Sequence, residues 1–340
     1  MQFSRILKNW LVINPVVVAA FGKIRNTALY RSMVVAAVQR RAQEMRAKRD
    51  YIIQIETTNL CNARCVFCSY TVMKREKKIM DDETFETIVR RIKEDGIKPY
   101  GVHLNGTGEP LLDNKIFHRI RRIKQEFPTA IVKFSSNFNL ANEARIEEIL
   151  TSGLDELNIS LNSYLKDVYQ DTMKIGYDRT EKNILSLLEK RKASGSKLKV
   201  RISMALVARN ETYENEFLKK WTKLVDSVTI NRVHSYSGAV AESAGDNKIN
   251  YENYPLPCRS LWTCISIAVD GKILLCCLDY EANNNLGNSR DNGLLELYSS
   301  KKFEQLRQMH LSGHIEPFEM CAKCSVPYEN GAHWFIKKLI

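Results

Sequence analysis

From residue 51 onward, short apolar runs of strand length alternate with longer segments in which apolar residues recur at helical spacing. Short apolar runs indicate buried strands, whereas a period of roughly 3.6 residues indicates amphipathic helices. The predicted strands are residues 51–55, 100–104, 131–135, 156–160, 199–205 and 227–232. The predicted helices are residues 82–95, 114–126, 142–152, 180–194 and 211–225. Six strands alternating with helices predict an α/β fold with a parallel sheet.

The first 50 residues follow a different pattern. Apolar side chains recur there at helical spacing, at Phe3, Ile6, Leu7, Trp10 and Leu11. This spacing predicts a basic amphipathic helix. Two apolar runs follow, residues 16–21 and 33–38, and neither approaches the ~20 apolar residues that span a bilayer. The arm either makes a peripheral membrane contact through residues 1–38 or packs as a cover on the rest of the chain.

Length and composition are those of a globular protein with one large and one smaller domain. The chain has 340 residues, of which 44% are hydrophobic and 26% are charged. Residues 1–50 contain ten Lys or Arg and two acidic residues, so they carry +8 of the +12 net charge. The basic character therefore belongs mainly to the arm. Without a nucleic-acid-binding motif, this charge does not predict a nucleic-acid partner.

Three cysteines follow the first predicted strand directly. Cys61, Cys65 and Cys68 have C-x3-C-x2-C spacing and polar flanks, which distinguishes them from ordinary core cysteines. Three thiolates leave one iron of a four-iron cluster without a protein ligand. The alternatives are a zinc site and three buried reduced thiols, because cysteine spacing does not by itself specify the metal.

Polar residues also end the next three predicted strands. A glycine-containing turn with a carboxylate follows the second strand, and Ser and Asn side chains end the third and fourth. In a barrel of parallel strands the reacting groups gather at the carboxyl ends of the strands. The residues at these ends are Gly106, Thr107, Gly108, Glu109, Ser136, Asn137, Ser160 and Asn162.

These features resemble the signature of radical S-adenosylmethionine (SAM) enzymes, over residues 51 to about 330. The resemblance implies a partial (β/α)6 barrel at residues 51–240. It also implies a [4Fe-4S] cluster on Cys61, Cys65 and Cys68 whose open iron binds SAM. By the same resemblance, Phe67 lies near the adenine.

The resemblance extends to the predicted SAM contacts. The turn from Gly106 to Glu109 resembles the family's G-G-E motif, with Thr107 inserted, so Gly108 and Glu109 are expected at the SAM amino group. The ends of the third and fourth strands are expected to face SAM, although Asn162 stands where many relatives have Asp. Arg201 in the fifth strand either meets the SAM carboxylate or is a solvated strand residue.

A second group of cysteines lies near the C-terminus. Cys258 and Cys276 are related by C-x12-G-x4-C spacing, and Cys321 and Cys324 follow as a C-x2-C pair. This pattern resembles the SPASM/twitch auxiliary-cluster domain of radical SAM enzymes, here at residues 250–330 before a tail at 331–340. Because no further cysteine follows the pair, the twitch type is expected, with one auxiliary [4Fe-4S] cluster on these four residues. A four-thiolate zinc site is the alternative.

Within this domain, Asp270 and Gly271 form a strong turn dipeptide and predict a hairpin between residues 263–268 and 272–276. Cys264 and Cys277 are left over. They are interpreted as packing residues, with Cys277 the alternative ligand because it adjoins Cys276.

The resemblance implies an enzyme that reductively cleaves SAM to a 5'-deoxyadenosyl radical, with an electron donor such as flavodoxin or ferredoxin as partner. A fully ligated auxiliary cluster suits electron transfer. The first hypothesis is therefore oxidation or epimerisation of a small polar, sugar-like substrate. The alternatives are a maturase of ribosomally synthesised peptides and a non-catalytic iron–sulfur electron-transfer protein.

Oxidation of an alcohol also requires a group that takes up a proton. The sixth predicted strand ends near Arg232 and His234, which share one face of an extended segment and are the predicted catalytic residues. Alternatively, that face points to solvent or to covering helices. An oxygen-sensitive cluster indicates the cytoplasm rather than export, although an Arg-rich, acid-poor arm is also typical of a mitochondrial transit peptide.

Overall fold

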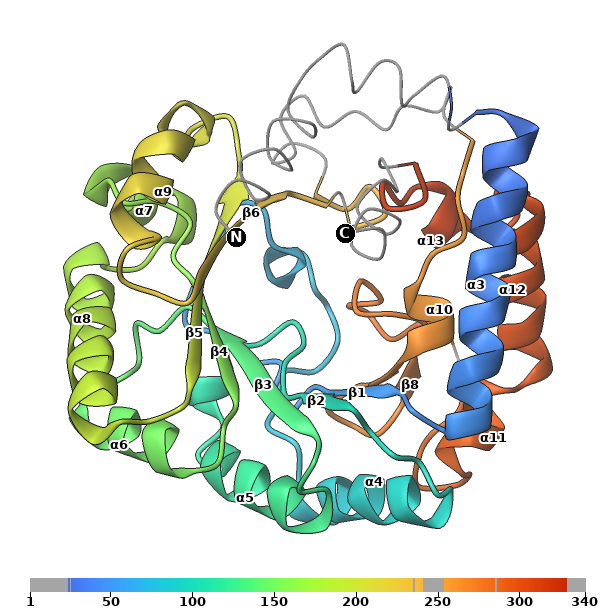
Figure 1. Cartoon of the computed structure of the whole chain (residues 1–340), viewed down its shortest axis with the longest axis horizontal. Helices are drawn as coiled ribbons and strands as arrows, with labels where there is room; N and C mark the ends of the chain where they lie inside the picture. The colour runs from blue at the N-terminus through green and yellow to red at the C-terminus, as the bar shows by residue number, and fades with distance from the viewer. Residues whose placement is uncertain (1–23, 25, 235, 241–253, 285, 329–340) are drawn as a thin grey trace.

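The computed structural model describes residues 24, 26–234, 236–240, 254–284 and 286–328. A curved sheet lies at the centre, with helices around its outside (Figure 1). In this described part the sheet has eight strands, in the order β6-β5-β4-β3-β2-β1-β7-β8. All neighbours pair in parallel except β7 and β8, which are antiparallel. The strands are β1 (Ile52–Ile55), β2 (Gly101–His103), β3 (Ile131–Ser136), β4 (Glu156–Ser160), β5 (Lys199–Leu206), β6 (Ser227–Arg232), β7 (Cys264–Ile267) and β8 (Ile273–Leu274).

The six strands predicted from hydrophobic patterning are confirmed, each within one residue at either end. The connecting helices are α4 (Asp82–Glu94), α5 (Ile116–Glu126), α6 (Glu143–Thr151), α7 (Lys166–Met173), α8 (Tyr177–Ser194) and α9 (Glu214–Trp221). The segment predicted as one helix at 211–225 instead begins with a 3-10 turn, η3 (Glu211–Tyr213), and α9 ends earlier. Helix α7 was not predicted, because eight residues with few buried positions show too little periodicity.

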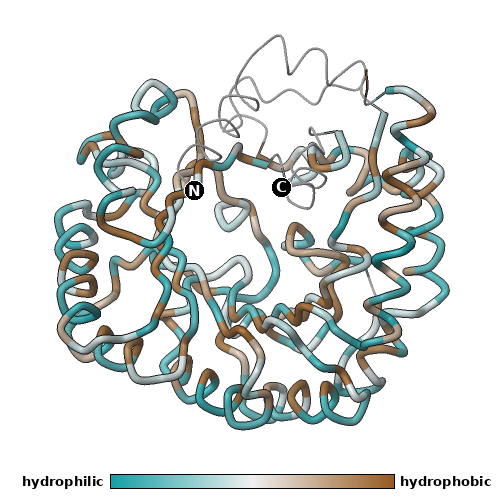
Figure 2. The backbone as a smooth tube through the Cα atoms, in the orientation of Figure 1, coloured by the Kyte–Doolittle hydropathy of each residue, from teal (hydrophilic) through white to brown (hydrophobic). Residues whose placement is uncertain are grey.

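Side chains along each parallel strand alternate between the outer helices and the concave face of the sheet. Ile53, Val102 and Val132 are fully buried at 0% exposure and join one core with apolar residues of α4 and α5. The amphipathic character of the outer helices is visible in Figure 2. The alternate positions, such as His103 and Lys133, face the other way and are paired in register. The interior of the partial barrel is therefore polar.

The predicted hairpin of the C-terminal part is confirmed. Strands β7 and β8 pair around a turn in which Gly271 has φ +83°, where a Cβ would lie 2.8 Å from the Asn288 side-chain oxygen. Strand β7 also pairs in parallel with β1, so this hairpin extends the barrel sheet. The remaining helices of the C-terminal part are α10 (Ser260–Thr263), α11 (Leu294–Tyr298), α12 (Lys301–Ser312) and α13 (Glu319–Ala322).

The end of the N-terminal arm forms helix α3 (Ala28–Lys48), which packs against the C-terminal part of the molecule. Val34, Val38 and Met45 are buried on it, and Arg46 donates a hydrogen bond of 3.2 Å to Glu304 of α12. These contacts favour the covering interpretation for this helix. The amphipathic segment at residues 3–11 lies outside the described residues. In the described part of the chain, no helix combines the length and apolar character needed to cross a membrane.

Candidate active site

The loop after β1 presents the first three cysteines together. The backbone N–H of Ala63 donates to Cys61 Sγ and that of Tyr70 to Cys68 Sγ, each at 3.4 Å. Burial raises the pKa of the Cys61 thiol to about 12, and the neighbouring Glu109 and Cys68 add to the shift. Such thiols ionise readily only beside a positive partner. Three thiols on one loop, two of them with amide hydrogens directed at sulfur, fit a [4Fe-4S] cluster with one open iron.

Helix α7, absent from the sequence-based prediction, supports this loop. The backbone N–H of Arg64 donates to the Met173 carbonyl at 3.2 Å, and Val66 donates to the Thr172 carbonyl at 3.0 Å. Cys65 Sγ also lies 3.4 Å from Met173 Sδ. The carboxyl end of α7 therefore fixes the middle of the cysteine loop.

Glu56, at the end of β1, ties the cysteine loop to its surroundings and was missed in the sequence analysis. Its carboxylate is 1% exposed and pairs with Arg75 Nη2 at 2.6 Å. It also accepts the Thr107 N–H at 3.0 Å and the Val269 N–H at 3.2 Å. One carboxylate thus holds the loop after β2, the β7–β8 turn and the segment after the cysteines. An acid ending an apolar strand is the signal that could have revealed it.

The glycines of the turn after β2 permit close packing on the cysteine loop. A Cβ on Gly106 would lie 2.5 Å from Glu56 Cγ, and one on Gly108 would lie 2.3 Å from the Thr58 carbonyl oxygen. Both distances are too short for any side chain. Packing within the protein therefore requires glycine at both positions, and a contact of this turn with SAM remains a prediction.

Glu109 lies beside the cysteines, as its influence on the pKa of Cys61 and Cys65 indicates. Its buried carboxylate accepts hydrogen bonds from Ser136 Oγ at 2.7 Å, the Asn137 N–H at 2.7 Å and the Leu111 N–H at 3.1 Å. Burial raises its pKa, and these three donors oppose the shift. The ends of β2 and β3 are thereby joined at one carboxylate.

The other predicted SAM contacts divide into two groups. Asn137 Nδ2 donates to Asn62 Oδ1 at 2.8 Å, so the end of β3 reaches the cysteine loop directly. Asn162 has φ +61° and uses its side chain internally: Oδ1 accepts the Ala205 N–H at 2.8 Å, and Nδ2 lies 2.9 Å from Met173 Sδ. A SAM contact from Asn162 remains a prediction.

Three further residues were predicted to contact SAM: Phe67, Ser160 and Arg201. Phe67 is half-buried against the core, and Ser160 is half-buried at the end of β4. Arg201 is exposed and donates through Nε to Ser227 Oγ at 3.2 Å. It pairs with Asn158, one inward-facing position nearer the start of the strands than Ser160. Its exposure agrees with a solvated strand residue, and a contact of Arg201 with the SAM carboxylate remains a prediction.

The second cysteine group surrounds a cavity of about 240 Å³. Burial raises the pKa of Cys276 strongly, and the neighbouring thiols of Cys277, Cys258 and Cys324 add to the shift. The Leu278 N–H donates to Cys276 Sγ at 3.4 Å. Among the described residues no three His, Cys, Asp or Glu side chains converge closely enough to hold a single metal ion. Thiols that line one cavity can supply the ligands of an iron–sulfur cluster. The cysteines in the cavity wall are Cys258, Cys276, Cys277, Cys321 and Cys324.

Tyr236 lies between the two cysteine groups and was also missed. Burial raises its pKa, and the thiols of Cys68, Cys277 and Cys65 add to the shift. Its ring meets that of Tyr280 edge to face, with the centroids 6.2 Å apart. Cys264 does not line the auxiliary cavity; its Sγ lies 3.6 Å from Ser266 Oγ.

His234 lies in the wall of the auxiliary cavity, with Nδ1 3.5 Å from Ser325 Oγ. Arg232 is the last residue of β6, and its side chain lies outside the described part of the structure. A catalytic role for either residue remains a prediction.

Two family models match the chain. The Radical SAM superfamily model matches residues 55–220, and the SPASM model, an iron–sulfur cluster-binding domain, matches residues 258–325. Each matched range contains one of the two cysteine groups. Radical SAM and SPASM domains bind [4Fe-4S] clusters and SAM, in agreement with the cofactors expected from the sequence.

Several curated relatives match part of the chain, and two of them illustrate the likeness. GTP 3',8-cyclase of Limosilactobacillus fermentum is 30% identical over 132 residues, which are 37% of this chain and 38% of the relative. A probable GTP 3',8-cyclase of Saccharolobus islandicus is 24% identical over 183 residues, which are 54% of this chain and 55% of the relative. The chain therefore spans only about two fifths to just over half of these relatives.

Solved structures share the fold. BtrN in complex with AdoMet and 2-DOIA has a TM-score of 0.55 at 18% identity, covering 81% of this chain and 92% of that one. Streptococcus suis SuiB bound to the precursor peptide SuiA has a TM-score of 0.61 at 15% identity, and the match covers 79% of this chain and 70% of SuiB. With both domains matched, this chain belongs to the radical SAM superfamily and is a radical SAM enzyme with a SPASM domain after its barrel.

Proposed function

We propose that this enzyme oxidises or epimerises a small polar, sugar-like substrate held on the concave face of its barrel. The observation that carries the proposal is the polar lining of that face. Apolar residues fill the helix-facing side of the strands, so the polar residues opposite them are not needed for the fold. A non-catalytic electron carrier has no use for such an interior.

Two side chains of this lining have unused hydrogen-bonding capacity. Lys133 is half-buried and burial lowers its pKa. Its side-chain amine makes no hydrogen bond or ion pair within the described residues, whereas its backbone carbonyl accepts the Leu104 N–H. Asn158 Nδ2 donates to Ser135 Oγ at 3.2 Å and to Ser203 Oγ at 3.1 Å, while its buried Oδ1 has no partner there. Buried polar groups are costly unless they are paired. A substrate with hydroxyl groups and an electron-rich or anionic group would satisfy both.

When bound, SAM and the first cluster supply a 5'-deoxyadenosyl radical that removes a hydrogen atom from substrate carbon, and the auxiliary cluster supplies an electron acceptor. Cys61, Cys65 and Cys68 would hold the first cluster, and the four-cysteine set, Cys258, Cys276, Cys321 and Cys324, the second. Lys133 and Asn158 would orient the substrate. Oxidation of an alcohol also releases the hydroxyl proton, which we assign to His234, just after β6. Arg232, the last residue of β6, would orient the substrate.

A second candidate is modification of a ribosomally made peptide, favoured by the fold likeness to peptide-bound SuiB. The cyclase relatives add a nucleotide as a third substrate class to test. Deuterium transfer separates these classes. The reconstituted, reduced enzyme is given SAM and deuterated polyols or aminocyclitols, deuterated GTP, or deuterated peptides, and 5'-deoxyadenosine is analysed by mass spectrometry. Deuterium from polyols or aminocyclitols supports the proposal, and deuterium from peptide or GTP alone replaces it.

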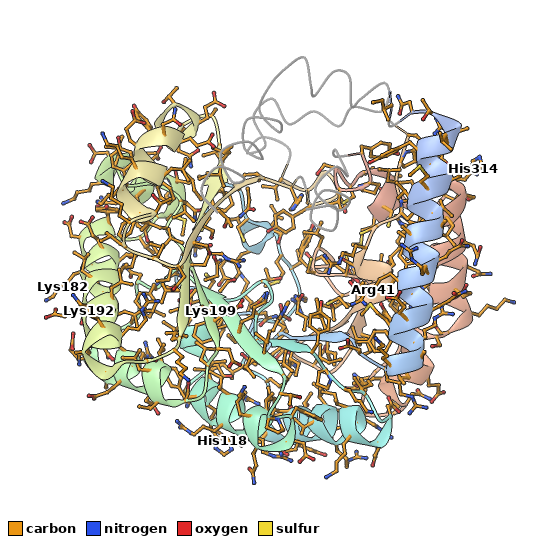
Figure 3. The ribbon with its side chains drawn as sticks, in the orientation of Figure 1. Arg41, His118, Lys182, Lys192, Lys199 and His314 are labelled. Carbon is orange, nitrogen blue, oxygen red and sulfur yellow. The ribbon has the colours of Figure 1, made fainter. Side chains whose placement is uncertain are left out.

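The role of the lining is tested by substitution. Lys133→Met should retain both clusters and uncoupled SAM cleavage while product formation falls at least tenfold. Lys182→Met is the matched control, because Lys182 lies on the outer helix α8, away from the concave face (Figure 3). At least one of the variants Arg232→Ala and His234→Ala should likewise retain both clusters and uncoupled SAM cleavage but lose product formation. Full turnover by Lys133→Met would exclude the barrel interior as the substrate site.

A further inference from the structure

A buried histidine lines the auxiliary cavity together with the cysteines. His310 lies on α12, is 1% exposed, and shares the cavity wall with Cys258, Cys276, Cys321 and Cys324. Helix α12 holds the ring firmly, because Phe303 and Leu306 on the same helix are buried in the core. Nothing in the family signature or in the cysteine pattern required a histidine here.

The hydrogen bonding of the ring determines its tautomer. The backbone N–H of Cys258 donates to His310 Nδ1 at 3.4 Å. A nitrogen that accepts an N–H carries no proton of its own, so the neutral ring carries its proton on Nε2. The ring therefore presents a single N–H donor, and one of the four predicted cluster ligands sets its orientation.

That donor has no acceptor in the described part of the chain. His310 Nε2 is buried and has no hydrogen-bond partner among the residues that the structure describes. A buried donor without an acceptor is unfavourable, and native proteins contain few of them. A donor left unsatisfied at the edge of a cavity is satisfied when the cavity is filled by a group that accepts hydrogen bonds. The sulfurs of an iron–sulfur cluster and of its thiolate ligands are such acceptors.

We propose that the Nε2–H of His310 donates a hydrogen bond to a sulfur of the auxiliary cluster or of its cysteine ligands, and so raises the reduction potential of that cluster. A hydrogen bond to sulfur stabilises the more negative, reduced state, and such bonds are among the factors that set cluster potentials. A partner outside the metal ligands that holds and tunes a site is common in metalloproteins. His310 is thus a positioning residue that favours electron acceptance by the auxiliary cluster.

The experiment compares the reconstituted holoenzyme with three variants. His310→Phe retains a ring of similar size without the donor. His310→Gln can accept the Cys258 N–H through its oxygen and direct its NH₂ at the cavity. His103→Phe removes a half-buried histidine of the barrel interior and serves as the control. Redox titration followed by EPR gives the potentials, with SAM addition marking the cluster that has the open iron. Deuterium ENDOR in D₂O detects an exchangeable proton near the auxiliary cluster.

The inference predicts a negative shift of the auxiliary potential in His310→Phe, with full iron content and loss of one exchangeable-proton coupling. His310→Gln should restore the coupling and most of the potential, and His103→Phe should change neither. Unchanged potential and coupling in His310→Phe would overturn the inference.

If His310→Phe fails to bind the auxiliary cluster, the His310→Gln variant decides. A retained cluster with a retained proton coupling supports the inference, and a retained cluster without that coupling refutes it. If His310→Gln also loses the cluster, wild-type ENDOR decides: the inference requires a strongly coupled exchangeable proton, and its absence refutes it. No substrate is needed, so failure here leaves the proposed reaction untouched.

Discussion

Replacement of Glu109 by glutamine tests the junction on which the predicted SAM site depends. The carboxylate is 3% exposed and accepts three hydrogen bonds, two of them at 2.7 Å. Glutamine has the same shape but replaces one acceptor oxygen by an NH₂ donor. In one orientation the NH₂ faces the Asn137 N–H, and in the other it faces the Leu111 N–H. In both orientations a backbone donor loses its acceptor.

The size of the effect follows from these contacts. A hydrogen bond to a charged group contributes about 1.5–3 kcal/mol, so Glu109→Gln should lower the free energy of unfolding by about that amount. Relief from burying a charge opposes this loss in part, since burial raises the pKa of Glu109. The carboxylate has about four lone-pair sites and three are used, which leaves one for the SAM amino group. Loss of the charge should therefore weaken SAM binding about tenfold or more.

Urea unfolding of the purified protein measures the first effect, and anaerobic calorimetric titration with SAM measures the second. Asp113→Asn is the matched control. Asp113 is also buried and follows the same turn, but it pairs with Arg119 Nε at 2.8 Å instead of facing the cysteines. This control should lose stability and keep its SAM affinity. Equal SAM affinity in Glu109→Gln and wild type would remove Glu109 from the SAM site.

Three further predictions concern other parts of the molecule. Replacing Cys61, Cys65 and Cys68 by Ala should leave about half of the iron, held by the second cysteine group; loss of all iron, or zinc in the second site, would contradict two clusters. Burial lowers the pKa of His103 to about 3, below its unfolded value of 6.5, so the unfolded chain takes up the proton first as pH falls. His103 should therefore cost about 2 kcal/mol of unfolding free energy between pH 7.5 and 5, and His103→Phe should remove that part of the pH dependence in urea titrations. Deleting residues 1–23, which leaves α3 in place, should abolish salt-sensitive binding to anionic vesicles; equal sedimentation with vesicles would exclude the arm as a membrane contact.

Hydrophobic patterning alone determined most of the barrel. Strands such as β4 and β6 were located to the residue because polar and apolar residues alternate along them, and this alternation is a local property of the sequence. The cysteine spacings and the turn at Gly271 were equally readable, since metal ligation and positive φ each demand particular residues at particular positions. Helix α7 was missed because only three of its eight residues, Tyr169, Thr172 and Met173, are buried, too few for a helical period to be recognised.

Only the tertiary structure decided which distant residues meet. The parallel pairing of β1 with β7 joins residues about 200 positions apart, and no local pattern encodes that partnership. The same applies to Glu56 with Arg75 and Val269, to Tyr236 between the two cysteine groups, and to the unsatisfied nitrogen of His310. A sequence shows what a side chain can bind, whereas its burial and its partners depend on how the chain folds around it. The cofactors of this enzyme were therefore readable from its sequence, and the surroundings that tune them were not.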